Sequence, residues 1–271
     1  MRNNDRVRKL LTGIAATVLS VALAAAGVDF GAAIAAEYRL SRAVRGAADL
    51  SWDPSVAILG FPFIPQAVRH HYDEIEIKAT DVAHPHVERA ALEATMHSIG
   101  ISEASWLIRP DAPLPIGKLE SRIIINSAHL GRFMDLKDLM VEAPTVETND
   151  ATGGTTESGI SASEGLVFTA TPRSAGFDEQ VSVSVDLSIV GPERTTLVFT
   201  PTGVLTGPGT ADQEVPADQL AAVLDEFRAT LPDQRLPFGV APTSQGARGS
   251  DVIIEGITED ITVTLGEFTQ P

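Results

Sequence analysis

The stretch Leu59-Gly60-Phe61-Pro62-Phe63-Ile64-Pro65 separates two strand-like runs and fixes the order of the elements around it. Apolar residues alternate with other residues over 51–59 before it and over 74–79 after it, which predicts two half-buried strands. Gly60 permits a sharp bend, and the two prolines have no amide hydrogen to donate to a ladder. We therefore predict a bend between strands here, followed by a short helical turn over 64–69.

The rest of the chain repeats this pattern of strands with a few helices. Period-2 alternation predicts further strands at 87–101, 119–127, 166–171, 180–190, 195–205, 251–258 and 259–265. Apolar residues three and four apart predict helices at 29–45, 129–141 and 217–231. Asp29 is the expected N-cap of the first helix, which we interpret as a core helix because Glu37 interrupts any basic stripe suited to a membrane surface. Long antiparallel strands with few helices predict an α+β fold.

The N-terminus predicts export. Four basic residues among the first nine precede an apolar run over 10–28. The small-x-small triplets at 22–24 and 24–26 favour a cleaved signal peptide, whereas the length of the run and the basic residues before it suit a membrane anchor. Both interpretations stay open, and both put the remainder outside the cytoplasm, in the periplasm or cell envelope. We expect one α+β domain over 29–271, with a mobile loop or insertion at 147–163 that is rich in Thr, Gly and acidic residues.

Charge and composition exclude several classes of function. The formal net charge of −16 disfavours nucleic acid as a partner, and also docking on anionic lipid through a basic patch. The chain has no cysteine, so neither disulfides nor thiolate chemistry is possible. Aromatic residues make up only 5% of the chain, so aliphatic side chains must supply most of the core.

No catalytic or metal-binding signature stands out in the sequence. His84-Pro85-His86 could place two imidazoles on one side of an extended segment, with Asp81 or Glu88 nearby, but a further ligand is missing and a polar turn is the simpler interpretation. Carboxylate pairs could serve a glycosidase, and Trp52 or Trp106 could stack on sugar, but neither pattern is specific. We predict no catalytic residue, no metal and no cofactor.

Several motifs in order carry a family resemblance. They are the basic-then-apolar leader, Ala36-Glu37 in the following helix, Gly60-Phe61-Pro62-Phe63 after a Val-x-Ile strand, and Leu236-Pro237-Phe238-Gly239-Val240 before the closing strands. Over roughly residues 29–268 the chain resembles the LmeA-like family of envelope phospholipid-binding proteins from actinobacteria, and the Gly60–Phe63 motif is the sharpest of these features. The resemblance implies a fold similar to BPI-like, tubular lipid-binding domains, in which a long curled antiparallel sheet wraps around a helix and leaves an apolar groove.

The same resemblance implies phospholipid binding or transfer in the envelope, and its LmeA branch supports the maturation of mannan-containing lipoglycans. By themselves, the apolar residues of the bend would be assigned to the core; the resemblance favours a groove rim. The predicted lipid contacts come from this bend and from the inner faces of the predicted helices. They are Phe61, Phe63, Ile64, Val68, Phe133, Leu136, Leu220, Leu224 and Phe227. Two alternatives remain: an envelope glycan-processing enzyme or subunit using paired carboxylates, and a structural envelope protein without a ligand.

Overall fold

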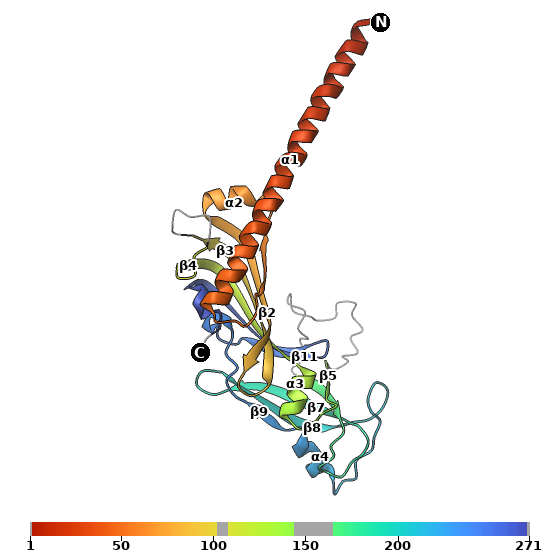
Figure 1. Cartoon of the computed structure of the whole chain (residues 1–271). Helices are drawn as coiled ribbons and strands as arrows, with labels where there is room; N and C mark the ends of the chain where they lie inside the picture. The colour runs from red at the N-terminus through yellow and green to blue at the C-terminus, as the bar shows by residue number, and fades with distance from the viewer. Residues whose placement is uncertain (1, 102–107, 144–164, 270–271) are drawn as a thin grey trace.

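A long helix projects from one end of a body built of two sheets (Figure 1). The computed structural model describes residues 2–101, 108–143 and 165–269, with side chains from residue 11 onward. The loop predicted at 147–163 lies outside the described residues, as does Trp106.

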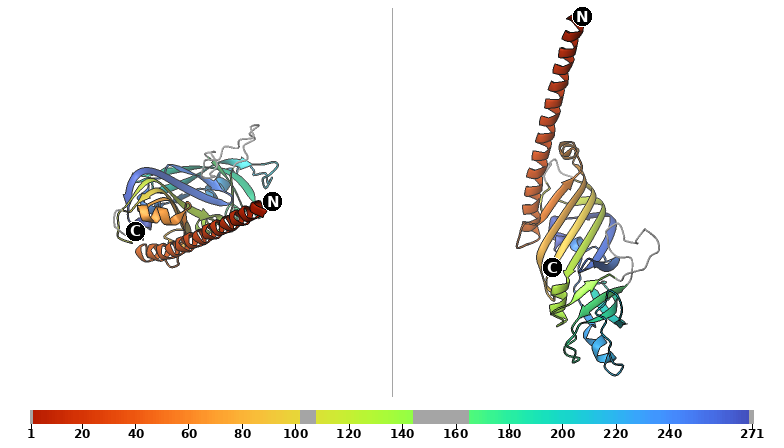
Figure 2. Two further views of the ribbon diagram at one scale, coloured as in Figure 1. Left: turned by 90° about the horizontal axis from the view of Figure 1, so that it is seen from above. Right: turned by 90° about the vertical axis from the view of Figure 1, so that its right-hand side faces the viewer.

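The larger sheet is a strongly curled antiparallel half-barrel of six strands (Figure 2). In sheet order its strands are β1 (Ser55–Leu59), β2 (His71–His84), β3 (Glu88–Gly100), β4 (Leu114–Asn126), β11 (Asp251–Val263) and β10 (Ser244–Arg248). The side chains of Ile75, Ile77 and Ala79 are buried on its inner face, as their alternation predicts. The register of β2 against β3 shifts between Ala79 and Val82, and such a bulge bends and twists a strand.

The second sheet lies at the end of the body far from the projecting helix (Figure 1). Its strands run in the order β5 (Met140–Glu142), β6 (Gly165–Ala170), β7 (Val181–Val190), β8 (Thr196–Leu205) and β9 (Ala229–Leu231). The rings of Phe168 and Phe199 meet at 5.6 Å in its core. The main cluster of buried apolar residues includes members of both sheets and of the long helix, so one core connects them. The predicted α+β fold with a curled antiparallel sheet is confirmed.

Two predicted helices and the two predicted C-terminal strands have different bounds in the structure. The helix predicted at 129–141 is the short α3 (Ser127–Phe133), because the chain turns at Asp135, whose φ is positive, and continues into β5. The helix predicted at 217–231 is α4 (Leu220–Glu226), because residues 229–231 pair with β8. The two strands predicted at 251–265 are one strand, β11, which pairs with β4 in a single register on both sides of Asp260. Tertiary pairing outweighed local pattern in each case.

The first helix also differs from its prediction. α1 runs without a break over Arg2–Ala47, so Asp29 lies in its middle and is not its N-cap. The Asp29 carboxylate is buried and accepts hydrogen bonds from the backbone amides of Phe63 at 2.8 Å and Ile64 at 2.7 Å. Asp29 therefore caps α2 (Phe63–Arg69), whose own N-cap residue is a proline without a side-chain acceptor.

The two halves of α1 have different environments. Leu40 and Val44 in its C-terminal half are buried against the curled sheet and the short helix η2 (Leu265–Phe268), and a second short helix, η1 (Pro237–Gly239), packs against η2. The apolar residues of 11–28 are exposed, except for the partly buried Ala26. Among the described helices, α1 over Leu11–Ala47 is long and apolar enough to cross a membrane, by length and composition.

Candidate functional site

An apolar recess of about 340 Å³ opens between the inner face of the curled sheet and η2. Its floor consists of Ala90, Leu92 and Ile123, whose side chains are almost fully buried, with Phe268 of η2 opposite. The β2–β3 hairpin supplies one wall through Val82, Ala83 and Pro85, and the rim carries His84, Asp233 and Arg235. An apolar floor under a few convergent polar groups is the usual composition of a small-molecule site.

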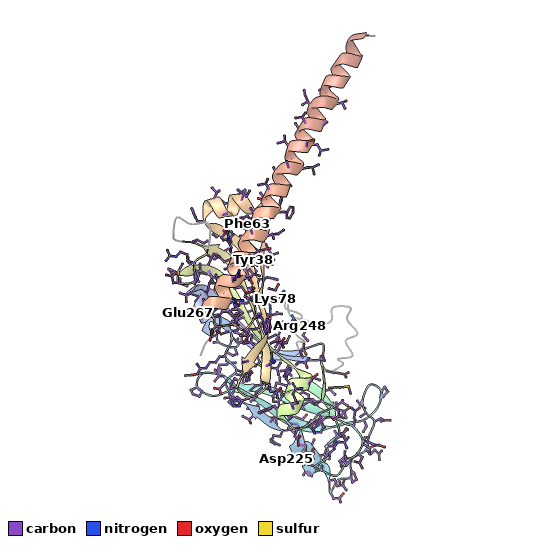
Figure 3. The ribbon with its side chains drawn as sticks, viewed as in Figure 1. Tyr38, Phe63, Lys78, Asp225, Arg248 and Glu267 are labelled. Atoms are coloured by element: carbon purple, nitrogen blue, oxygen red, sulfur yellow. The ribbon has the colours of Figure 1, made fainter. Side chains whose placement is uncertain are left out.

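A wider cleft of about 900 Å³ adjoins this recess and shares the lining residues Val82, Ala83 and Thr269 with it. The α1–β1 connection over 47–55 forms one side of the cleft, and β2 over 78–83 forms the other. We call the recess and the cleft together the groove. Figure 3 shows Phe63 near the end where α1 projects, Asp225 at the opposite end, and Lys78, which lines the cleft, between them.

The hairpin wall of the groove is fixed by hydrogen bonds at its turn. Nδ1 of His84 accepts from the backbone amides of His86 and Val87 at 3.2 and 3.3 Å. Nε2 of His86 lies 3.0 Å from the carboxylate of Asp233, which connects the hairpin to the segment before η1. Burial, together with the neighbouring imidazole of His86, lowers the pKa of His84 below its usual value. His84 thus presents a neutral ring to the recess at neutral pH.

The predicted polar turn at 84–86 matches these contacts. Among residues 2–101, 108–143 and 165–269, the structure brings together no group of three or more His, Asp or Glu side chains suited to a metal ion.

The cleft carries carboxylates, which bear on the predicted alternative of a glycan-processing enzyme. They are Asp49, Asp53, Asp81 and Glu93, and Trp52 is beside them with 71% of its surface exposed. Three of them are near an arginine: Asp53 at 3.1 Å, Asp81 at 4.0 Å and Glu93 at 3.8 Å. A glycosidase keeps one carboxyl group protonated in an apolar environment, whereas Asp53 and Asp81 are exposed beside arginines and the less exposed Glu93 lies near Arg248. The geometry does not supply an acid and base pair of that kind.

The nine residues predicted as lipid contacts do not form one site, and none lines the groove. Phe61, Ile64 and Val68 are exposed around α2, while Phe63 is buried and stacks on Tyr72 at 5.9 Å. The other five lie in the far half of the body. Phe133 and Leu136 belong to α3 and the turn after it, and Leu220, Leu224 and Phe227 lie in or beside α4. A lipid contact at any of the nine stays a prediction.

The groove residues escaped prediction because their signal is small side chains. Val82 pairs with Ala90, and Ala79 pairs with Leu92, so two alanines occupy neighbouring inner positions of β2 and β3. A small residue at an inner position leaves space between a sheet and the element that covers it. Alanines at inward positions of adjacent strands were therefore the available signal, but only the strand register shows that Ala79 and Ala90 are neighbours.

Comparison with known proteins agrees with this architecture. The family model for LmeA-like phospholipid-binding matches residues 27–257. Neither the search of curated proteins nor the search of solved structures gave a match. Since the family model covers most of the chain, including most of the curled sheet and the residues of both parts of the groove except the C-terminal ones, the protein belongs to the LmeA-like phospholipid-binding family.

Proposed function

We propose that the groove holds a phospholipid, with acyl chain in the apolar recess and the headgroup toward the open cleft, and that the protein does no chemistry on it. The observation that carries this proposal is that a recess with an apolar floor adjoins a wider cleft that also carries charged side chains, in a member of a phospholipid-binding family. The recess and the cleft each fall within the range of about 300–1,000 Å³ that is usual for ligand sites.

The physical chemistry of the lining suits an amphipathic ligand. Burial of acyl methylenes against Leu92, Ile123 and Phe268 is favourable by about 25 cal/mol per Å², before the costs of association. Arg235 on the rim of the recess and Lys78 in the cleft supply cations for a phosphate. Arg235 is 3.9 Å from Glu193, and Lys78 is 2.9 Å from Glu76, so a phosphate would compete with carboxylates for both.

The cellular setting belongs to the same proposal. The apolar N-terminal part of α1 suits a signal peptide or an anchor, and either would put the groove outside the cytoplasm. There the protein would carry phospholipid between envelope compartments and support lipoglycan (mannan) maturation. The Arg-paired, exposed carboxylates of the cleft argue against the alternative of a glycan-processing enzyme, and the recess argues against a solidly packed protein without a ligand.

A bulky side chain in the groove tests the proposed location. Ala83 is exposed and lines both the recess and the cleft, so Ala83→Trp should obstruct the groove where its two parts meet, at little cost in folding. Ala222 on α4 is also exposed but lies far from the groove, so Ala222→Trp is the matched control. We expect Ala83→Trp to lower uptake of a fluorescent phospholipid by delipidated protein at least several-fold, with Ala222→Trp unchanged. Equal uptake by the two variants would exclude the groove as the site.

A further inference from the structure

Five large apolar side chains are exposed together where α1 leaves the body. Two are from α1 and three are from the bend and α2, and we call them the apolar platform: Phe30 (60% exposed), Ile34 (65%), Phe61 (64%), Ile64 (38%) and Val68 (71%). Phe30 and Ile34 are four residues apart, as are Ile64 and Val68, so each pair shares one face of its helix. An exposed cluster of this kind marks an interaction surface, and it is separate from the groove.

The platform is a fixed unit made of two distant segments. The ring of Phe30 stacks on that of Phe61 with 5.5 Å between centroids. Next to this stack, the buried carboxylate of Asp29 accepts the backbone amides of Phe63 and Ile64 and so attaches α2 to α1. The exposed apolar groups of α2 therefore keep a constant position relative to the axis of α1.

The course of α1 indicates what covers the platform. Its residues 11–28 are uncharged, predominantly apolar and, except for the partly buried Ala26, exposed; at a rise of 1.5 Å per residue these 18 residues span about 27 Å, close to the hydrocarbon thickness of a bilayer. The helix continues without a break. Phe30 then lies about 3 Å and Ile34 about 9 Å beyond Val28 along the axis, which is the depth of the headgroup layer.

The charges beside the platform agree with a bilayer surface. Although the chain has a net charge of −16, the last turn of α2 carries Arg69, next to Val68 of the platform. A cation next to an apolar surface is favourable near lipid phosphates, and Phe is one of the residues that membrane-surface helices bury below the headgroups. The driving force for insertion is the burial of apolar side chains, so a bilayer of neutral lipid is sufficient for docking.

We propose that the apolar platform inserts into the headgroup layer of the bilayer that α1 enters. Docking there fixes the body on the membrane rather than leaving it to swing on a single helix. The cleft begins at Ala47, which is 17 residues beyond Phe30, so docking holds the groove about 26 Å from the platform along α1. The groove then lies beyond the platform, on the side away from the anchoring membrane.

The absence of cysteine makes a direct test possible, because each variant carries a single labelling site. Full-length Ile64→Cys and Val68→Cys, labelled with an environment-sensitive fluorophore, are reconstituted in phosphatidylcholine vesicles that contain a headgroup-nitroxide lipid. Val190→Cys on β7 is the control, since Val190 is 43% exposed and lies in the second sheet. We expect blue-shifted emission and several-fold stronger nitroxide quenching at positions 64 and 68 than at 190.

Equal quenching at the three positions would overturn the proposal. Efficient disulfide cross-linking between copies at Ile64→Cys without nitroxide quenching would also overturn it and assign the platform to a second copy of the chain. Adding Ala83→Trp to either labelled variant separates this inference from the proposed lipid site. If phospholipid uptake is lost while nitroxide quenching is retained, the result bears on the groove and leaves the membrane contact of the platform in place.

Discussion

Replacing Asp29 by alanine tests the attachment of α2 to the long helix. In the wild type its carboxylate is 5% exposed and accepts two backbone amides, those of Phe63 and Ile64, at 2.8 and 2.7 Å. Alanine removes both acceptors at once. The amide of Phe63 is then left buried without a partner, whereas water can reach the amide of Ile64, which is only partly buried.

The expected cost follows from these two bonds. A hydrogen bond to a charged group contributes about 1.5–3 kcal/mol, and loss of an N-cap costs about 0.5–2 kcal/mol. With one amide rehydrated, Asp29→Ala should lower the free energy of unfolding by about 3 kcal/mol. Asp29→Asn keeps one acceptor oxygen but loses the charge, so it should cost about 1–2 kcal/mol.

The assay is urea unfolding of full-length protein in a mild detergent, followed by circular dichroism. Glu37→Ala is the matched control on the same helix, because Glu37 accepts one part-buried amide, that of Ile58 at 2.9 Å, and its loss should cost about 1 kcal/mol. The reasoning fails if Asp29→Ala is no more destabilising than Glu37→Ala, or if it lies within about 0.5 kcal/mol of wild type.

Three further predictions concern titration and packing. Burial raises the pKa of Glu226, so the folded state loses stability as pH rises through that pKa. In urea unfolding, Glu226→Gln should therefore raise the free energy of unfolding at pH 7 and leave it unchanged near pH 4. Burial lowers the pKa of His84, so the free energy of unfolding should fall as pH drops below about 6.5. His84→Asn keeps an acceptor for the turn amides, and unfolding measured over this pH range should show a smaller fall for this variant. A methyl group at Gly256 would collide with the carbonyl oxygen of Ala241, so Gly256→Ala should cost about 1–3 kcal/mol in urea unfolding, whereas Gly203→Ala, with open space around it, should be nearly neutral; equal midpoints would contradict the packing argument.

Much of the fold could be predicted from periodicity alone. The alternation of Glu74–Ala79 identifies β2 because one face of the curled sheet is buried and the other is exposed to solvent. The role of Asp29 could not be predicted, since an aspartate before an apolar helical pattern is the usual sign of an N-cap, and only tertiary structure reveals that its carboxylate serves a different helix 34 residues on. Residues 229–231 followed helical spacing, yet the edge of β8 offered them backbone partners.

The groove was harder to predict than the fold. Its walls come from three distant parts of the chain, represented by Leu50, Ala83 and Phe268, and no local pattern joins them. Apolar residues such as Phe227 satisfied the pattern of a lipid contact equally well, but Phe227 is fully buried in the core of the far half. The hydrophobicity of a side chain can be read from the sequence, whereas a recess depends on where small residues lie on neighbouring strands of the folded sheet.

The most direct test of the central claim is native mass spectrometry of full-length protein released from detergent, before and after incubation with phospholipid vesicles. The account predicts a mass increase corresponding to bound phospholipid in the wild type and in Ala222→Trp, and its reduction in Ala83→Trp. A wild-type protein that carries no phospholipid after purification and takes up none from vesicles would contradict it.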